Sequence, residues 1–152
     1  LKENNIPVIY EHPFSLPLRR WESYDVKYKV PFELYRAGVK FCISYSSSTF
    51  QAAHQRSLPY ASAIAVSFGL PKDEGLKAIT LYPAEILGVE DRLGSIEVGK
   101  EATLFVSSGD PLEMDSVIEM AFIKGKSVEL NDRHKILSKK YLEKYRQLKL
   151  TD

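Results

Sequence analysis

Two short apolar runs near the start of the chain predict β-strands with one helix between them. Residues 6–10 and 39–43 are both of the strand type. Between them, residues 31–38 are typical of a short helix, with Pro31 in its first turn and Gly38 at its end. A strand, a helix and a second strand in this order predict a βαβ unit whose strands are parallel neighbours.

Each predicted strand is followed by residues that suggest function. The irregular segment 12–28 contains two prolines, two arginines and the only tryptophan of the chain. Loops of this length inside compact domains are usually functional or disordered. A polar run, residues 44–49, leaves the C-terminal end of the second strand. Parallel α/β folds normally place function at that end, although the run is equally consistent with a mobile loop.

Three helices are predicted next. Residues 58–68 are small and apolar nearly all round, as expected of a buried helix, and a glycine ends it. Pro71 opens a second helix, in which Leu76 and Ile79 are expected to face inward. Residues 80–88 predict a third short helix that ends at its own glycine.

From Arg92 the pattern becomes that of β-structure, because glycine turns separate runs that are alternating or fully apolar. Four runs are expected to form an antiparallel sheet apart from the first two strands: residues 96–98, 102–106, 117–123 and 127–130. Lys124, Gly125 and Lys126 are expected to form the tight turn of a hairpin. The final segment, residues 135–148, predicts a helix with one apolar face and a solvated basic face.

Composition narrows the class of protein. With 152 residues, 44% of them hydrophobic and 27% charged, the chain is expected to be soluble and to form a core. A net charge of +1 does not favour nucleic acid or a membrane surface as a partner. The single cysteine, Cys42, excludes an internal disulfide and is expected to be a small buried hydrophobe. Both cytoplasm and periplasm stay open as compartments.

A continuous string in the middle of the chain resembles the amidohydrolase superfamily. Residues 69–88 resemble the last barrel helices of that superfamily. Residues 92–106, followed by Gly109-Asp110-Pro111-Leu112, resemble the return of its chain into a small β-sandwich. Order, spacing and residue types are similar to the imidazolonepropionase-like branch.

The resemblance implies an α/β fold: the last part of a TIM-like (β/α)8 barrel, with two parallel strands plus helices, then the C-terminal share of a small β-sandwich and a terminal helix. Residues 1–91 would be the barrel part, 92–130 the sandwich part and 131–152 the helix. A closed barrel needs eight strands. We therefore expect a C-terminal fragment whose partner is the missing N-terminal portion or another copy, with residues such as Phe41 and Ile43 uncovered when the chain is alone.

The chemistry implied by the resemblance is hydrolysis. Amidohydrolases bind divalent metal ions that lower the pKa of a bound water, and an aspartate ending barrel strand eight takes a proton as that water attacks a C–N bond. Aligned on the family pattern, Ser46 takes the place of this aspartate. A neutral hydroxyl is a poor ligand for a hard divalent ion and a poor base. The metal site is thus expected to be altered, with no metal bound by this chain and a zinc-type ion only in the complete protein.

His12, Tyr45 and Ser46 are the candidate substrate-binding residues. His12 follows the first strand, and the other two follow the second, at the end that would be the active face of the barrel. The alternative for His12 is an ordinary loop histidine. His54 and His134 are expected at the surface, and no two histidines have metal-ligand spacing.

Three functional hypotheses remain. The first is a piece of a hydrolase that acts on non-peptide C–N bonds and is inactive without the rest of its protein. The second is a non-catalytic amidohydrolase relative that binds a small molecule or a protein partner. The third, a free-standing interaction module, is disfavoured by the barrel-like βαβ unit.

Overall fold

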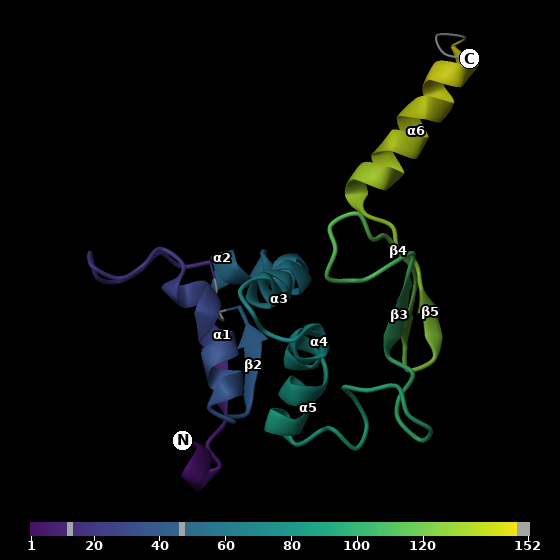
Figure 1. Cartoon of the computed structure of the whole chain (residues 1–152). Coiled ribbons are helices and arrows are strands. Elements are labelled where there is room, and N and C mark those ends of the chain that lie inside the picture. The colour runs from purple at the N-terminus through teal and green to yellow at the C-terminus, as the bar shows by residue number, and fades with distance from the viewer. Residues whose placement is uncertain (12–13, 46–47, 149–152) are drawn as a thin grey trace.

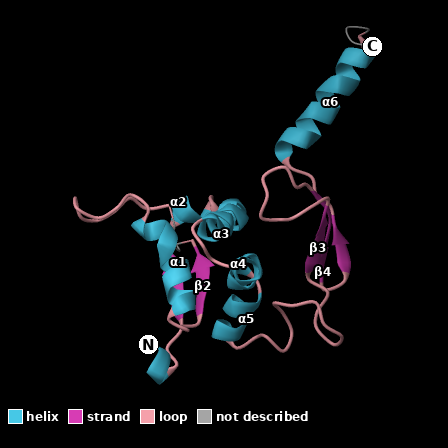
Figure 2. Ribbon diagram, in the orientation of Figure 1, coloured by secondary structure: helices cyan, strands magenta, loops and turns pink. Residues whose placement is uncertain are grey.

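The computed structural model describes residues 1–11, 14–45 and 48–148 (Figure 1). Within this part of the chain the strands form two separate sheets, one of two strands and one of three. Figure 2 shows them on different sides of the molecule, with most of the helices gathered around the two-stranded sheet. The α/β class expected from the sequence is confirmed.

The two-stranded sheet confirms the predicted βαβ unit. Strand β1, Val8–Glu11, and strand β2, Phe41–Ser44, are parallel, with Val8 opposite Phe41 and Glu11 opposite Ser44. The helix α1, Val26–Arg36, connects them and contacts β2. Before β1, the short 3-10 helix η1, Lys2–Asn4, ends at Asn5, whose φ of 49° lies in the left-handed region that asparagine tolerates.

The predicted position of Pro31 is wrong, because α1 begins at Val26 and Pro31 lies inside it. An interior proline has no N–H to donate to the carbonyl of the fourth residue before it, here Lys27. The Tyr10 hydroxyl on β1 donates to that carbonyl oxygen at 2.7 Å. Burial raises the pKa of Tyr10, so its hydroxyl keeps the proton that this bond requires. A side chain of the sheet therefore replaces the missing helical bond.

The helices after β2 are α2, Thr49–Ala52, η2, Gln55–Ser57, α3, Leu58–Ser67, α4, Lys72–Ile79, and α5, Leu81–Leu87. The last three confirm the predicted helical block. The inward position predicted for Leu76 is wrong, since its side chain is exposed, whereas Ile79 does pack against the core. Gly75 and Ala78 are the buried residues of α4.

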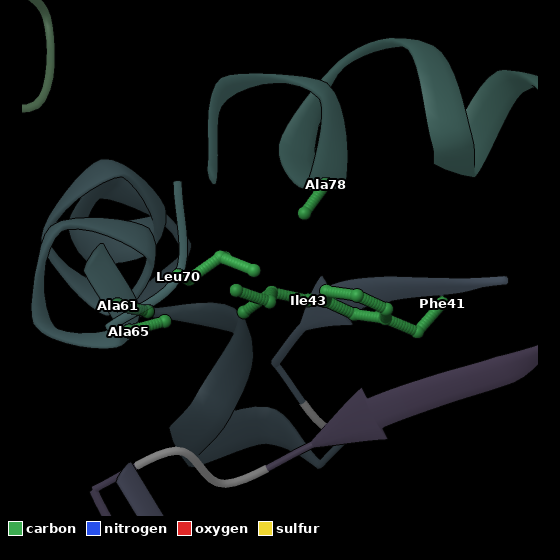
Figure 3. Close-up of a cluster of buried hydrophobic side chains, with 6 residues drawn as sticks. All are labelled: Phe41, Ile43, Ala61, Ala65, Leu70 and Ala78. Carbon is green, nitrogen blue, oxygen red and sulfur yellow. The ribbon is translucent and has the colours of Figure 1, made fainter. Parts of the chain in front are cut away.

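The core lies between β2 and these helices (Figure 3). Its buried members come from β2, α3, α4 and the turn between the two helices: Phe41, Ile43, Ala61, Ala65, Leu70 and Ala78. Helices α3 and α4 approach closely because small residues line their contact. The buried Ser62 hydroxyl donates to the Gly75 carbonyl at 2.6 Å, and a Cβ at Gly75 would lie 2.6 Å from Val66 Cγ2.

The three-stranded sheet confirms the predicted antiparallel unit, apart from one strand. Strands β3, Leu104–Ser107, β4, Ile118–Ile123, and β5, Lys126–Val128, pair in the order β3-β4-β5. Residues 96–98 are not a strand, although their apolar residues alternate, and Ile96 and Val98 are exposed in a turn-rich segment. The predicted hairpin between β4 and β5 is confirmed, but its turn is shorter than expected: Lys124 and Gly125 have positive φ, and Lys126 already begins β5.

Residues 110–112, which follow β3, contact α4 and so hold this sheet against the helical region. Asp110, after β3, forms an ion pair with Lys72 at the start of α4. Leu112 is buried and lies beside Gly75 of α4. The Leu112 N–H donates to Asp110 Oδ1 at 3.0 Å, so the two residues that contact α4 are also hydrogen-bonded to each other.

The last helix, α6, Arg133–Gln147, projects away from both sheets (Figure 1). Its first turn is capped by Asp132, which accepts from the Lys135 N–H at 2.8 Å. Its apolar stripe is exposed: Leu137, Tyr141, Tyr145 and Leu148. No helix in the described ranges is long and apolar enough to cross a membrane.

Candidate functional site

The carboxyl end of the parallel pair is the candidate site, since this end of a parallel sheet is where α/β folds collect binding residues. Glu11 and Ser44 are opposite each other in the last register position. Along a strand, alternate residues share a face. Val8, Phe41 and Ile43 belong to the face packed against the helices. Glu11 and Ser44 therefore lie on the other face, together with Ile9 and Cys42.

Tyr45 is the one candidate residue within the described part of the chain. It is half-buried, packs against the core cluster, and its ring lies 6.3 Å from that of Phe14 at an interplanar angle of 27°. Burial raises the pKa of the Tyr45 phenol, so it is neutral and available as a hydrogen-bond donor. Its contact with Phe14 joins the segments that follow the two strands. His12 and Ser46 lie outside the described residues.

The residues that the structure describes offer few side chains that could bind a metal ion together. They contain no group of three or more histidine, cysteine, aspartate or glutamate residues arranged to hold a metal ion. Cys42 is buried as predicted, and burial raises the pKa of its thiol, which keeps it protonated and a poor ligand. His54 and His134 are exposed, as expected, and His54 Nδ1 lies 2.7 Å from the Phe50 carbonyl oxygen.

The segment after β1 contains polar residues to which the sequence assigned no role. Arg19, Arg20 and Trp21 are exposed there. The Glu22 carboxylate accepts from the backbone N–H groups of Leu18 and Arg19 at 3.1 and 3.2 Å. The only sequence signal for this arrangement was the unusual length of the loop, because the bonds that shape it depend on the folded backbone.

Comparison with known proteins identifies relatives. The amidohydrolase family profile matches residues 33–128, which is more than half of the chain. An imidazolonepropionase from Mesorhizobium japonicum is 34% identical over 79 residues, which are 51% of this chain and 19% of that protein. The amidohydrolase tasK of Hapsidospora irregularis is 36% identical over 58 residues, 38% of this chain and 6% of that protein.

Among solved structures, an amidohydrolase from Thermotoga maritima is similar, with a TM-score of 0.66 and 32% sequence identity. The similarity covers 84% of this chain and 32% of that protein. The chain thus spans a third or less of the length of each of these three relatives.

Proposed function

The chain belongs to the amidohydrolase family, and from this premise we propose that it is the C-terminal part of a hydrolase that acts on non-peptide C–N bonds. The observation behind the proposal is the parallel β1–β2 pair. Parallel neighbouring strands are what a barrel requires, and the similarity to a solved amidohydrolase covers 84% of this chain. In that arrangement β1 and β2 are the seventh and eighth barrel strands. The β3–β4–β5 sheet is the C-terminal share of the β-sandwich, and residues 1–91, 92–130 and 131–152 are the three parts of the chain.

This chain would contribute the wall of the site rather than its metal ligands. The family is generally metal-dependent, and a bound divalent ion would supply an activated water. The described residues do not fit that role, since they hold no ligand cluster. Ser46 at the position of the family aspartate would leave the ion without its usual carboxylate. The proposed contributions to substrate binding are His12, Tyr45 and Ser46.

Metal content and hydrolysis of the full-length protein test this proposal. Purified protein is assayed for divalent metal and for turnover of cyclic and acyclic amides. We expect bound metal that survives Ser46→Ala, since Ser46 would not be a ligand. Ser46→Asp should increase metal content, whereas Ser67→Asp, at an exposed serine ending α3, should not. Stoichiometric zinc that disappears on Ser46→Ala would contradict the altered site.

The second candidate function is a non-catalytic relative that binds a small molecule or a protein. The aspartate-to-serine difference favours it, because the usual proton acceptor would be absent. Full-length protein that binds amides but neither retains metal nor turns them over would support this candidate over the first.

We also propose that the chain works together with the remainder of its protein or with another copy. Ile9 of β1 is 52% exposed, and large apolar side chains of the three-stranded sheet are exposed as well. Light scattering on the isolated 152 residues tests the idea. Association or poor solubility supports it, and a stable monomer with a cooperative melt contradicts it.

A further inference from the structure

The connection between β1 and α1 is long for its place in the fold. Strand β1 ends at Glu11 and α1 begins at Val26. Connections from strand to helix in α/β units usually have about 2–6 residues, and longer ones tend to be binding loops or lids. In Figure 1 residues 14–25 lie toward the carboxyl end of the sheet and extend away from α3, α4 and α5. It is thus at the functional end without being part of the core.

The tip of this connection is a closed turn, residues 18–22, here called the arginine turn. The Glu22 carboxylate accepts two backbone N–H groups, from Leu18 and Arg19, and the Glu22 N–H donates to the Arg19 carbonyl at 3.1 Å. These bonds fix the backbone on which both arginines stand. Glu22 is the acidic residue closest in sequence to both arginines. One of its carboxylate oxygens, Oε2, is engaged by these main-chain donors.

Among the residues that the structure describes, the two guanidinium groups have no acidic partner. In the residues that the structure describes, neither Arg19 nor Arg20 forms an ion pair, whereas Arg36 at the other end of α1 pairs with Glu33. The Arg19 guanidinium lies 5.8 Å from the centre of the exposed Trp21 ring. Stacking on an aromatic ring restricts a guanidinium while leaving its planar fork of N–H donors open.

We propose that the arginine turn binds an oxyanion, a carboxylate or phosphate, on the substrate of this protein. A planar fork of donors matches such groups in a bidentate manner, and arginine is the side chain best suited to that recognition. Trp21 holds Arg19 in place and offers a flat apolar surface to the adjoining part of the substrate. The inference deepens the proposed function and rests on it, because it takes the carboxyl end of the sheet to be the substrate site.

Binding to matched probes tests the inference in the full-length protein. The carboxylate probes are the N-acetyl derivatives of proline, leucine and phenylalanine, each compared with its C-terminal amide. The phosphate probe is N-acetyl-O-phosphoserine amide, compared with N-acetylserine amide. Calorimetry gives the affinity of each pair for the wild type, Arg19→Gln, Arg20→Gln and the double variant. Circular dichroism confirms that each variant is folded.

We expect the wild type to prefer the charged member of at least one pair. Loss of one charge-assisted contact should weaken binding of that member about tenfold or more and leave its neutral partner unchanged. Arg36→Gln is the matched control, because Arg36 is also exposed and lies 5.7 Å from the Phe32 ring centre, but at the opposite end of α1. It should change neither member.

Three results overturn the inference: no preference for any charged probe, equal weakening of charged and neutral partners, or the same loss with Arg36→Gln. Which probe pair responds distinguishes carboxylate from phosphate. The assay does not depend on turnover. Charge preference without hydrolysis would leave the arginine turn standing while the hydrolase proposal fails, and hydrolysis without charge preference would do the reverse.

Discussion

The region around β2 and the sheet β3–β4–β5 bury their large side chains to different extents. Phe41 of β2 is 2% exposed, because α1, α3, α4 and α5 all contact that strand. Phe105 of β3 is 47% exposed. Both are phenylalanines within strands, so their chemistry is the same and only the cover differs. A chain that is similar to a third of a solved amidohydrolase can therefore complete one core from local helices and leave a second face open.

Truncation of the two phenylalanines should destabilise the two regions by very different amounts. Phe41→Ala should lower the free energy of unfolding by about 3–5 kcal/mol, the usual cost of a large cavity in a core. Phe105→Ala should cost only about 1 kcal/mol, since much of its ring is already in water. Urea unfolding of the 152-residue chain, diluted until light scattering finds no association, measures both. Equal costs would mean that another surface covers the sheet in solution.

Gly75→Ala tests whether the closed core depends on the close approach of α3 and α4. In an open helix this change stabilises by up to about 1 kcal/mol, through helix propensity. Here the new Cβ would meet Val66 Cγ2 at 2.6 Å and Ser62 Oγ at 2.9 Å. We expect net destabilisation of about 1–2 kcal/mol, since overpacking a core outweighs propensity. A higher melting temperature would contradict the tight contact.

Tyr10→Phe tests the bond that joins the sheet to α1. Removing the hydroxyl leaves the Lys27 carbonyl without its donor and should cost about 1 kcal/mol. In a Pro31→Ala background the new N–H of residue 31 can donate to that carbonyl within the helix. The same tyrosine substitution should then cost less. A double-mutant cycle with zero coupling would show that the hydroxyl does not replace the missing helical bond.

The smallest expected effect concerns the ion pair that ties the two regions together. Lys72 and the Leu112 N–H hold the pKa of Asp110 below its usual range. A depressed carboxyl pKa stabilises the fold above the ordinary pKa, and the contribution is lost as pH falls through the folded value. Lys72→Gln should raise the pKa of Asp110 only part of the way back, because the Leu112 bond remains. Carboxyl titration by NMR measures the change, and an unchanged pKa would mean that the pair does not form in solution.

Local patterns in the sequence were enough for the parallel pair, the hairpin and the order of strands and helices, apart from the strand expected at residues 96–98. Features that depend on distant partners were not predictable. Pro31 was expected at a helix start, and its interior position is tolerated because Tyr10 supplies a donor from another element. Leu76 was expected inside, but α4 presents Gly75 and Ala78 to its neighbours and turns Leu76 outward.

The expectation that Phe41 and Ile43 would be uncovered was also wrong. It counted the strands that a barrel would add and overlooked the cover that later helices of the same chain provide. At the candidate site, family likeness pointed to the carboxyl end of the strands, and His12, Tyr45 and Ser46 stay predictions there. The arginine turn could not be predicted, since it depends on where a glutamate side chain meets backbone N–H groups.

The tip of the hairpin between β4 and β5 has a consequence for hydrogen–deuterium exchange. Amides at the tip of a two-residue turn usually exchange rapidly, because water reaches them. Here the Gly125 N–H donates to the Ala102 carbonyl at 2.9 Å and the Lys124 N–H to Thr103 Oγ1 at 3.1 Å. Both acceptors precede β3, so these amides are released only when that edge separates from the hairpin. Their exchange rates would therefore report the separation of β3 from the β4–β5 hairpin.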